Sequence, residues 1–246
     1  MFFPFLILIS QDVPAPAEPP RFAQCMDLAT GDPAQGLANA TKWRSEGGGA
    51  LARQCEGVAY ANQGRWASAA AAFEQAARDA ELAKSPKVAD YHVQSGNAWL
   101  AAGEAGKARA AFDAALVTGT LAGLALGEAH LDRARALMLA GDSEPARSDI
   151  DKALENAPGD PLAWLLSATL ARRTGDLKRA ASDIAEALKR SPDDAMVQLE
   201  AGSIAAAAGD EANARTAWNR VIELSPGSPA AESARKALAQ FAVAEK

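Results

Sequence analysis

Residues 161–194 read PLAWLLSATLARRTGDLKRAASDIAEALKRSPDD, and residues 195–228 read AMVQLEAGSIAAAAGDEANARTAWNRVIELSPGS. The two stretches are equally long, and both place a Gly-Asp pair, an alanine, a large apolar residue and a proline at the same offsets. Self-similarity at a fixed period of roughly 20–50 residues is the signature of a repeat architecture, in which each unit is one supersecondary element. The same offsets therefore decide how the rest of the chain is divided.

The repeat extends toward the N-terminus through five glycines that are each followed by a polar residue. These glycines stand at spacings of 39, 38, 34 and 34 residues and are Gly64, Gly103, Gly141, Gly175 and Gly209. Five residues after each of them is an alanine, namely Ala69, Ala108, Ala146, Ala180 and Ala214. Nine residues after is a large apolar residue, namely Phe73, Phe112, Ile150, Ile184 and Trp218. Seven residues before is a small residue, namely Gly57, Gly96, Ala134, Ala168 and Gly202.

This pattern closely resembles the tetratricopeptide repeat, a unit of about 34 residues in which a turn joins two helices. In that unit glycine ends the first helix, small residues let the two helices approach each other, and the large residue fills the gap between units. The resemblance implies an all-α fold, a right-handed α-α superhelix of about five full repeats. The composition agrees, because the chain is rich in alanine and lacks the alternation of β-branched and aromatic residues that strands require.

The offsets predict where the units begin and end. We expect full units at 50–83, 89–122, 127–160, 161–194 and 195–228. The five and four extra residues after the first and second units are each close to one helical turn, so we expect them to lengthen a second helix or a connector. Residues 22–49 resemble a degenerate first unit, and residues 229–246 are expected to form a capping helix. Such atypical ends cover apolar surface that an internal unit would leave exposed.

Residues 1–21 differ from the rest of the chain, because an apolar start, MFFPFLILI, precedes a Pro-rich linker. Nine apolar residues are too few to span a bilayer, which takes about 20 residues as a helix, but they match the apolar part of a secretory signal. The basic start of such a signal is missing, since the first Lys or Arg is Arg21. We predict a periplasmic or secreted protein of the bacterial envelope type without a stable membrane span. The alternative is a cytoplasmic protein.

The two cysteines, Cys25 and Cys55, fall on the first helices of the degenerate unit and of the first full unit. Those helices should be neighbours in the stack. In an exported protein a disulfide between the two cysteines is reasonable. The alternative is a pair of small buried apolar residues, because the geometry of a disulfide is demanding.

Charge and motifs exclude several classes of function. The net charge is −6 and no run of basic residues occurs, so we expect no nucleic-acid partner. Phosphate-binding loops, Gly-x-Ser-x-Gly and His-Glu-x-x-His are absent from the sequence, which predicts a protein that is not an enzyme and uses no cofactor. His92 and His130 lie at equivalent positions of successive units, and no further metal-ligating group is nearby. Packing is therefore favoured over a metal site.

The resemblance implies that the first helices line a concave groove that binds a protein or peptide partner. The family's groove-facing positions include Gln54, Asn62, Asn97, Leu131, Arg135, Thr169 and Arg172. We expect Arg135 and Arg172 to point into the same concavity and to bind an acidic group. The sequence thus predicts a non-catalytic interaction scaffold, and the alternative is a structural assembly factor of a cell-envelope complex. A carrier of small apolar ligands is disfavoured, because the pattern has no enclosed pocket.

Overall fold

Glycine turns join pairs of helices throughout residues 20–244, the part of the chain that the computed structural model describes. The degenerate unit consists of α1 (Pro20–Gly31) and α2 (Pro33–Ser45). The first helices of the full units are α3 (Gly49–Asn62), α5 (Val88–Ala101), α7 (Gly123–Ala140), α9 (Pro161–Arg173) and α11 (Ala195–Ala207). The second helices are α4 (Trp66–Leu82), α6 (Ala105–Val117), α8 (Ser143–Asn156), α10 (Leu177–Arg190) and α12 (Glu211–Leu224). The helix α13 (Pro229–Ala244) closes the stack.

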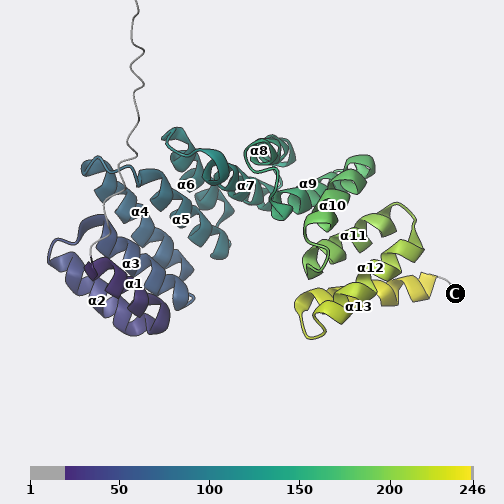
Figure 1. Cartoon of the computed structure of the whole chain (residues 1–246), viewed down its shortest axis with the longest axis horizontal. Helices are drawn as coiled ribbons and strands as arrows, with labels where there is room; N and C mark the ends of the chain where they lie inside the picture. Colours follow the sequence, from purple (N-terminus) through teal and green to yellow (C-terminus); the bar gives the residue numbers. More distant parts are fainter. Residues whose placement is uncertain (1–19, 245–246) are drawn as a thin grey trace, which may run out of the picture.

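The helices follow one another along an open arch, from α1 and α2 at one end to α13 at the other (Figure 1). The predicted all-α superhelix is confirmed, and the described residues contain no strand. The first helices lie on the inner side of the arch, since α5 approaches α7, α7 approaches α9 and α9 approaches α11. The apolar start, for which we predict export, lies outside the described residues.

Each turn glycine has the left-handed conformation that its place at the end of a first helix requires. Gly141 has φ +87°, and Gly175 has φ +85°. In this region a side chain is strained, whereas glycine is not. Aspartates then cap several helices. The side chain of Asp194 accepts hydrogen bonds from the backbone N–H groups of Met196 and Val197 at the start of α11. The turns recognised in the sequence are thus the points at which the chain reverses.

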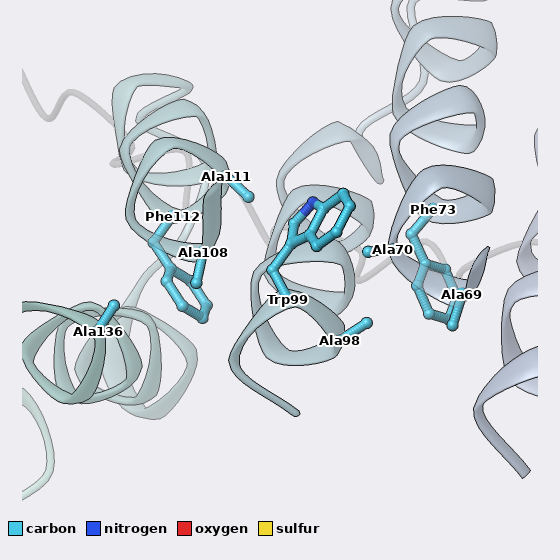
Figure 2. Packing of buried hydrophobic residues seen from close by; sticks show 9 residues of the cluster. All are labelled: Ala69, Ala70, Phe73, Ala98, Trp99, Ala108, Ala111, Phe112 and Ala136. Atoms are coloured by element: carbon cyan, nitrogen blue, oxygen red, sulfur yellow. The ribbon is translucent and has the colours of Figure 1, made fainter. Parts of the chain in front are cut away.

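The small residue of the first helix and the large residue of the second helix are matched in size within each unit. In the second unit, a Cβ atom on Gly96 would lie only 2.6 Å from a ring atom of Phe112. The same close approach joins Gly57 to Phe73 and Gly202 to Trp218. The third and fourth units carry alanine in place of the glycine and isoleucine in place of the ring. Phe73 and Phe112 also flank Trp99 in one buried cluster (Figure 2).

We expect Gly96→Ala to lower the free energy of unfolding by about 1–3 kcal/mol, because the ring of Phe112 has to give way in a closely packed core. Adding Phe112→Ile recreates the alanine–isoleucine pair of the third and fourth units. The double variant should therefore be more stable than the sum of the two single losses predicts, as measured by urea denaturation. Gly106→Ala is the matched control, because a Cβ atom there meets no atom within 4 Å. Additive losses in the double variant would contradict the size matching.

The two insertions are accommodated differently. The first lengthens α4 to 17 residues, whereas α8, α10 and α12 have 14 each. The second leaves α6 at 13 residues, so its residues enter the connector 118–122 and an early start of α7, which has 18 residues. The expectation of a longer second helix or connector therefore describes the first insertion fully. It describes the second only in part, because the following first helix is also extended.

Polar residues at the seventh position connect each of the first four full units to the second helix of the unit before it. These bonds join Glu56 to Arg44, Ser95 to Ala70, Arg133 to Asp113 and Ser167 to Arg147, over 2.8, 3.2, 2.7 and 2.6 Å. The N-terminal join is also covalent, since Cys25 of α1 and Cys55 of α3 form a disulfide that is fully buried. Buried polar groups need hydrogen-bonding partners, and here those partners lie on the preceding unit and connect the two units.

Candidate functional site

Three open cavities lie along the inner side of the arch. The largest, about 890 Å³, lies between α5, α7 and the start of α9, and we call it the acidic cavity for the aspartates and the glutamate in its lining. The arginine cavity, about 360 Å³, is formed farther along the same three helices and contains Arg135 and Arg173. The leucine cavity, about 410 Å³, lies between α9 and α11. Shared residues make these cavities one continuous groove, namely Asn97, Leu162 and Leu166.

Large apolar side chains are exposed in this groove. Leu124 is 60% exposed and lies in the acidic cavity, and Leu139 is 67% exposed and lies in the arginine cavity. Leu162 is 42% exposed between the acidic and the leucine cavities, and Met196 is 55% exposed in the leucine cavity. Apolar side chains that gather in one exposed depression mark a surface that a partner covers. The inner side of the arch is therefore the candidate site.

Four carboxylates line the acidic cavity, and two of them have a structural use. Asp160 caps α9 by accepting a hydrogen bond from the N–H of Leu162 at 2.9 Å. Asp132 accepts a bond from Arg135 at 2.9 Å. Asp90 and Glu128 are exposed and have no hydrogen-bonding or ion-pair partner in the described part of the chain. This cavity therefore has negative charge that no residue in the described part of the chain neutralises.

The arginine cavity carries the opposite charge. Arg173 is exposed, and within residues 20–244 it makes no ion pair or side-chain hydrogen bond. Arg135, whose side chain is 45% exposed, is paired among the described residues only with Asp132 of its own helix. Met138 and Leu139 of α7 add apolar surface beside the two guanidinium groups. An acidic group seated here would find two cations and an apolar wall.

Four of the residues predicted to face the groove line its cavities. They are Asn97 and Leu131 in the acidic cavity, Arg135 in the arginine cavity and Thr169 in the leucine cavity. Asn97 also lines the arginine cavity, is exposed, and makes no side-chain hydrogen bond to any described residue. The hydroxyl of Thr169 is used within α9, where it donates to the carbonyl oxygen of Leu165 at 2.9 Å.

Two predicted groove residues connect helices instead of lining a cavity. The Nε2 group of Gln54 lies 3.3 Å from Oε1 of Gln94 and joins α3 to α5. Asn62 donates to the carbonyl oxygen of Ala29 at 3.1 Å and joins α3 to α1. Both polar side chains therefore contribute to the joins between units at the N-terminal end of the groove.

Arg172 differs from its expected role. Its Nε and Nη2 atoms donate to the two carboxylate oxygens of Glu200 at 2.7 and 3.2 Å, so its charge is already paired. The cation that lines a cavity together with Arg135 is the next residue, Arg173. The expected pair of Arg135 and Arg172 is thus replaced by Arg135 and Arg173, because Glu200 of α11 lies within reach of Arg172.

The family resemblance implies that the second position of the units faces the groove, but its residues were not named among the candidates, and the sixth position was missed. In the second to fifth units, the second position holds Asp90, Glu128, Leu162 and Met196, and the sixth holds Gln94, Asp132, Leu166 and Glu200. All eight line a cavity of the groove. The signal that finds them is the repeat register itself, since positions three or four residues apart share a helix face.

The remaining candidates have structural surroundings. His130 lies against Asp149, with its Nδ1 atom 3.0 Å from Oδ1, and the half-buried His92 lies 3.8 Å from a carboxylate oxygen of Glu81. Within residues 20–244, no three His, Cys, Asp or Glu side chains gather in a way that could hold a metal ion. None of the described helices is both long enough and apolar enough to cross a membrane.

Comparison with protein families agrees with the repeat register. Two family models, both described as tetratricopeptide repeat, match residues 56–123 and 165–229 and residues 127–170. The chain belongs to the tetratricopeptide repeat family. The comparison with curated proteins found no match.

Solved structures of the same fold span most of the chain. PilW, described as a widely conserved type IV pilus biogenesis factor, is 21% identical with a TM-score of 0.71 over 87% of this chain and 96% of its own. PilF of Pseudomonas aeruginosa is 16% identical with a TM-score of 0.66, and the match covers 92% of this chain and 98% of PilF. YrrB, described as a tetratricopeptide protein with an unusual peptide-binding site, is 18% identical with a TM-score of 0.57. The match covers 80% of this chain and 96% of YrrB. At these identities the likeness is one of fold.

Proposed function

We propose that this protein is a non-catalytic scaffold that binds a segment of a protein partner in the groove along α5, α7, α9 and α11. The observation that carries the proposal is the exposure of Leu124, Leu139, Leu162 and Met196 in one continuous depression. Burying such side chains is favourable by about 25 cal/mol per Å² of apolar surface. The family supports the same function, since the concave side of stacked repeats serves as an extended binding surface.

An extended segment fits this groove better than a compact ligand does. The three cavities share residues and follow one another across four helices, so a single small molecule would fill only part of the surface. Ligand pockets for small molecules bury most of the ligand, whereas these cavities are open to solvent. A protein segment can place successive side chains in successive cavities.

The experiment compares apolar side chains inside the groove with others outside it. A photo-cross-linking residue at Leu139 should capture the partner, and the captured segment is then synthesised and its Kd measured. We expect Leu139→Ser with Leu162→Ser to weaken binding by at least about tenfold, because a loss of about 1.4 kcal/mol suffices for that factor. Circular dichroism checks that the variant is folded.

The matched control is Leu82→Ser with Val117→Ser. These side chains are 86% and 84% exposed, and they lie at the ends of α4 and α6, outside the three cavities. We expect the control to bind as tightly as the unaltered protein. Weaker binding by the control together with unchanged binding by the groove variant would place the partner outside the groove.

The second candidate is a structural assembly factor of a cell-envelope complex in the periplasm. A disulfide between Cys25 and Cys55 supports it, because disulfides persist in oxidising compartments. The likeness in fold to PilW, described as a pilus biogenesis factor, supports it by analogy alone. The same cross-linking experiment separates the candidates. A scaffold that uses its groove cross-links through Leu139, whereas an assembly factor whose groove is secondary cross-links through Leu82 or Val117.

A further inference from the structure

We propose that the groove selects a protein segment by its charges: a basic side chain enters the acidic cavity, and an acidic side chain enters the arginine cavity. This inference rests on the proposed function and specifies the partner of the same groove. It follows from the separation of charge along α7, where Glu128 lies in the acidic cavity and Arg135 in the arginine cavity.

The acidic cavity lacks a cation of its own. No Lys, Arg or His is among its lining residues in the described part of the chain, whereas Asp90 and Glu128 are exposed in it without a partner. Carboxylates that face the same cavity repel each other, and a bound cation relieves that repulsion. Leu121 and Leu124 supply apolar surface for the aliphatic stem of a lysine or arginine.

Helix capping does not account for both free carboxylates. Asp90 lies in the first turn of α5, where the helix dipole favours a negative charge. Glu128 is the sixth residue of α7, which begins at Gly123, and the dipole effect is confined to the first turn. Capping therefore does not explain Glu128, whereas a cation of the partner would pair with it.

The arginine cavity is suited to the opposite charge. Arg173 has no partner within residues 20–244, and Arg135 has only the nearby Asp132. A guanidinium group binds a carboxylate through two parallel hydrogen bonds, which fixes both position and orientation. An aspartate or glutamate of the partner could form this ion pair with Arg173, and its methylene groups would cover the apolar side chain of Leu139.

The distance between the two charges sets the spacing in the partner. Glu128 and Arg135 are seven residues apart on α7, and a helix rises about 1.5 Å per residue, so their Cα atoms are separated by about 10 Å along the axis. A chain in the extended polyproline II conformation rises about 3.1 Å per residue and has three residues per turn, so side chains three positions apart lie on the same face, about 9 Å apart. The basic and acidic residues of the partner should therefore stand three positions apart. Asn97 lines both cavities, and its free amide can bond to the backbone between those residues.

The test uses synthetic eight-residue peptides of the form SVXVLZVS, with lysine, glutamate or glutamine at X and Z, and the full chain. Binding is followed by fluorescence anisotropy at low salt, because exposed charges are screened as salt rises. We expect the peptide with lysine at X and glutamate at Z to bind about tenfold more tightly than the peptide with two glutamines, since exposed ion pairs contribute about two- to fivefold each.

Charge-neutral variants locate the effect. Asp90→Asn with Glu128→Gln should remove the preference for lysine over glutamine, and Arg173→Gln should remove the preference for glutamate over glutamine. Glu155→Gln is the matched control, because Glu155 is an exposed carboxylate of α8 outside the three cavities and should leave both preferences unchanged.

The other outcomes overturn the inference in distinguishable ways. If the charged and the glutamine peptides bind equally and Leu162→Ser weakens both, the groove binds apolar segments without reading charge, and the proposed function stands alone. If the preference for lysine over glutamine survives in Asp90→Asn with Glu128→Gln, a site other than the acidic cavity recognises the basic residue. If no designed peptide binds but the segment captured through Leu139 does, the groove binds a segment without this charge pattern, and only this inference fails.

Discussion

Asp149→Ala is expected to lower the free energy of unfolding by about 2–4 kcal/mol, because it leaves two polar groups without their buried partner. Asp149 is 2% exposed on α8 and accepts three hydrogen bonds from α7. Nε and Nη2 of Arg133 donate to its two oxygens at 2.7 Å each, and Nδ1 of His130 lies 3.0 Å from Oδ1. Urea denaturation at neutral pH measures the loss.

The effect should extend beyond one helix pair. Arg133 also donates to Asp113 of α6 at 2.7 Å, so the same guanidinium group connects the second unit to the third. This is the join at which the second insertion lies. Asp113→Asn is the control, because the side chain of Asp113 is 47% exposed and exposed ion pairs contribute about 1 kcal/mol or less. If both variants lowered the free energy of unfolding equally, the burial of Asp149 would not account for its contribution to stability.

Acid should remove the contribution of Asp149. Burial raises the pKa of this carboxyl group, but the hydrogen bonds and charges of Arg133 and His130 lower it more, and the pKa is below its ordinary value of 3.8. A carboxyl group with a depressed pKa stabilises the folded state above the unfolded pKa, and this stability is lost as the pH falls through the folded pKa. As the pH falls below 3.8, Asp149→Asn should therefore lose less stability than the unaltered protein.

Much of the fold could be predicted from the sequence because its decisive signals are local. A glycine such as Gly141 ends a helix through its own backbone conformation, and the residue nine positions later packs within the same unit. Each unit is nearly a repetition of the one before, so one register places every helix pair. The groove positions of Asn97, Leu131 and Arg135 followed from the same register.

The partners of polar side chains could not be predicted in this way, because they depend on distances between units. The register places Arg172 on the inner side of the arch, but its pairing with Glu200 requires α9 and α11 to be close together. The polar seventh positions, among them Ser95 and Arg133, are visible in the sequence. The partners of Ser95 and Arg133 in the preceding unit lie 25 and 20 residues earlier, on a different helix. The charge of each cavity is therefore a property of the stack rather than of one unit.

Replacing both cysteines by alanine is expected to destabilise the N-terminal end of the solenoid by about 3–4 kcal/mol. The disulfide between Cys25 and Cys55 closes a loop of 30 residues, and cross-links of this length stabilise mainly by restricting the unfolded chain. Both cysteines are fully buried among Phe22, Ala29 and Trp43, so alanine retains an apolar core at a small additional packing cost.

The loss should be local, because each unit of a solenoid contacts only its neighbours. In hydrogen exchange, the amides of α1 and α2 should exchange faster in Cys25→Ala with Cys55→Ala than in the oxidised protein, whereas those of α9 to α12 should be unchanged. A reducing agent should reproduce this pattern in the unaltered protein and have no effect on the double variant. Alkylation of two free thiols in native, unreduced protein would contradict the bridge. Faster exchange spread evenly from α1 to α13 would instead show that the stack unfolds as one unit, so that the cross-link stabilises all of it.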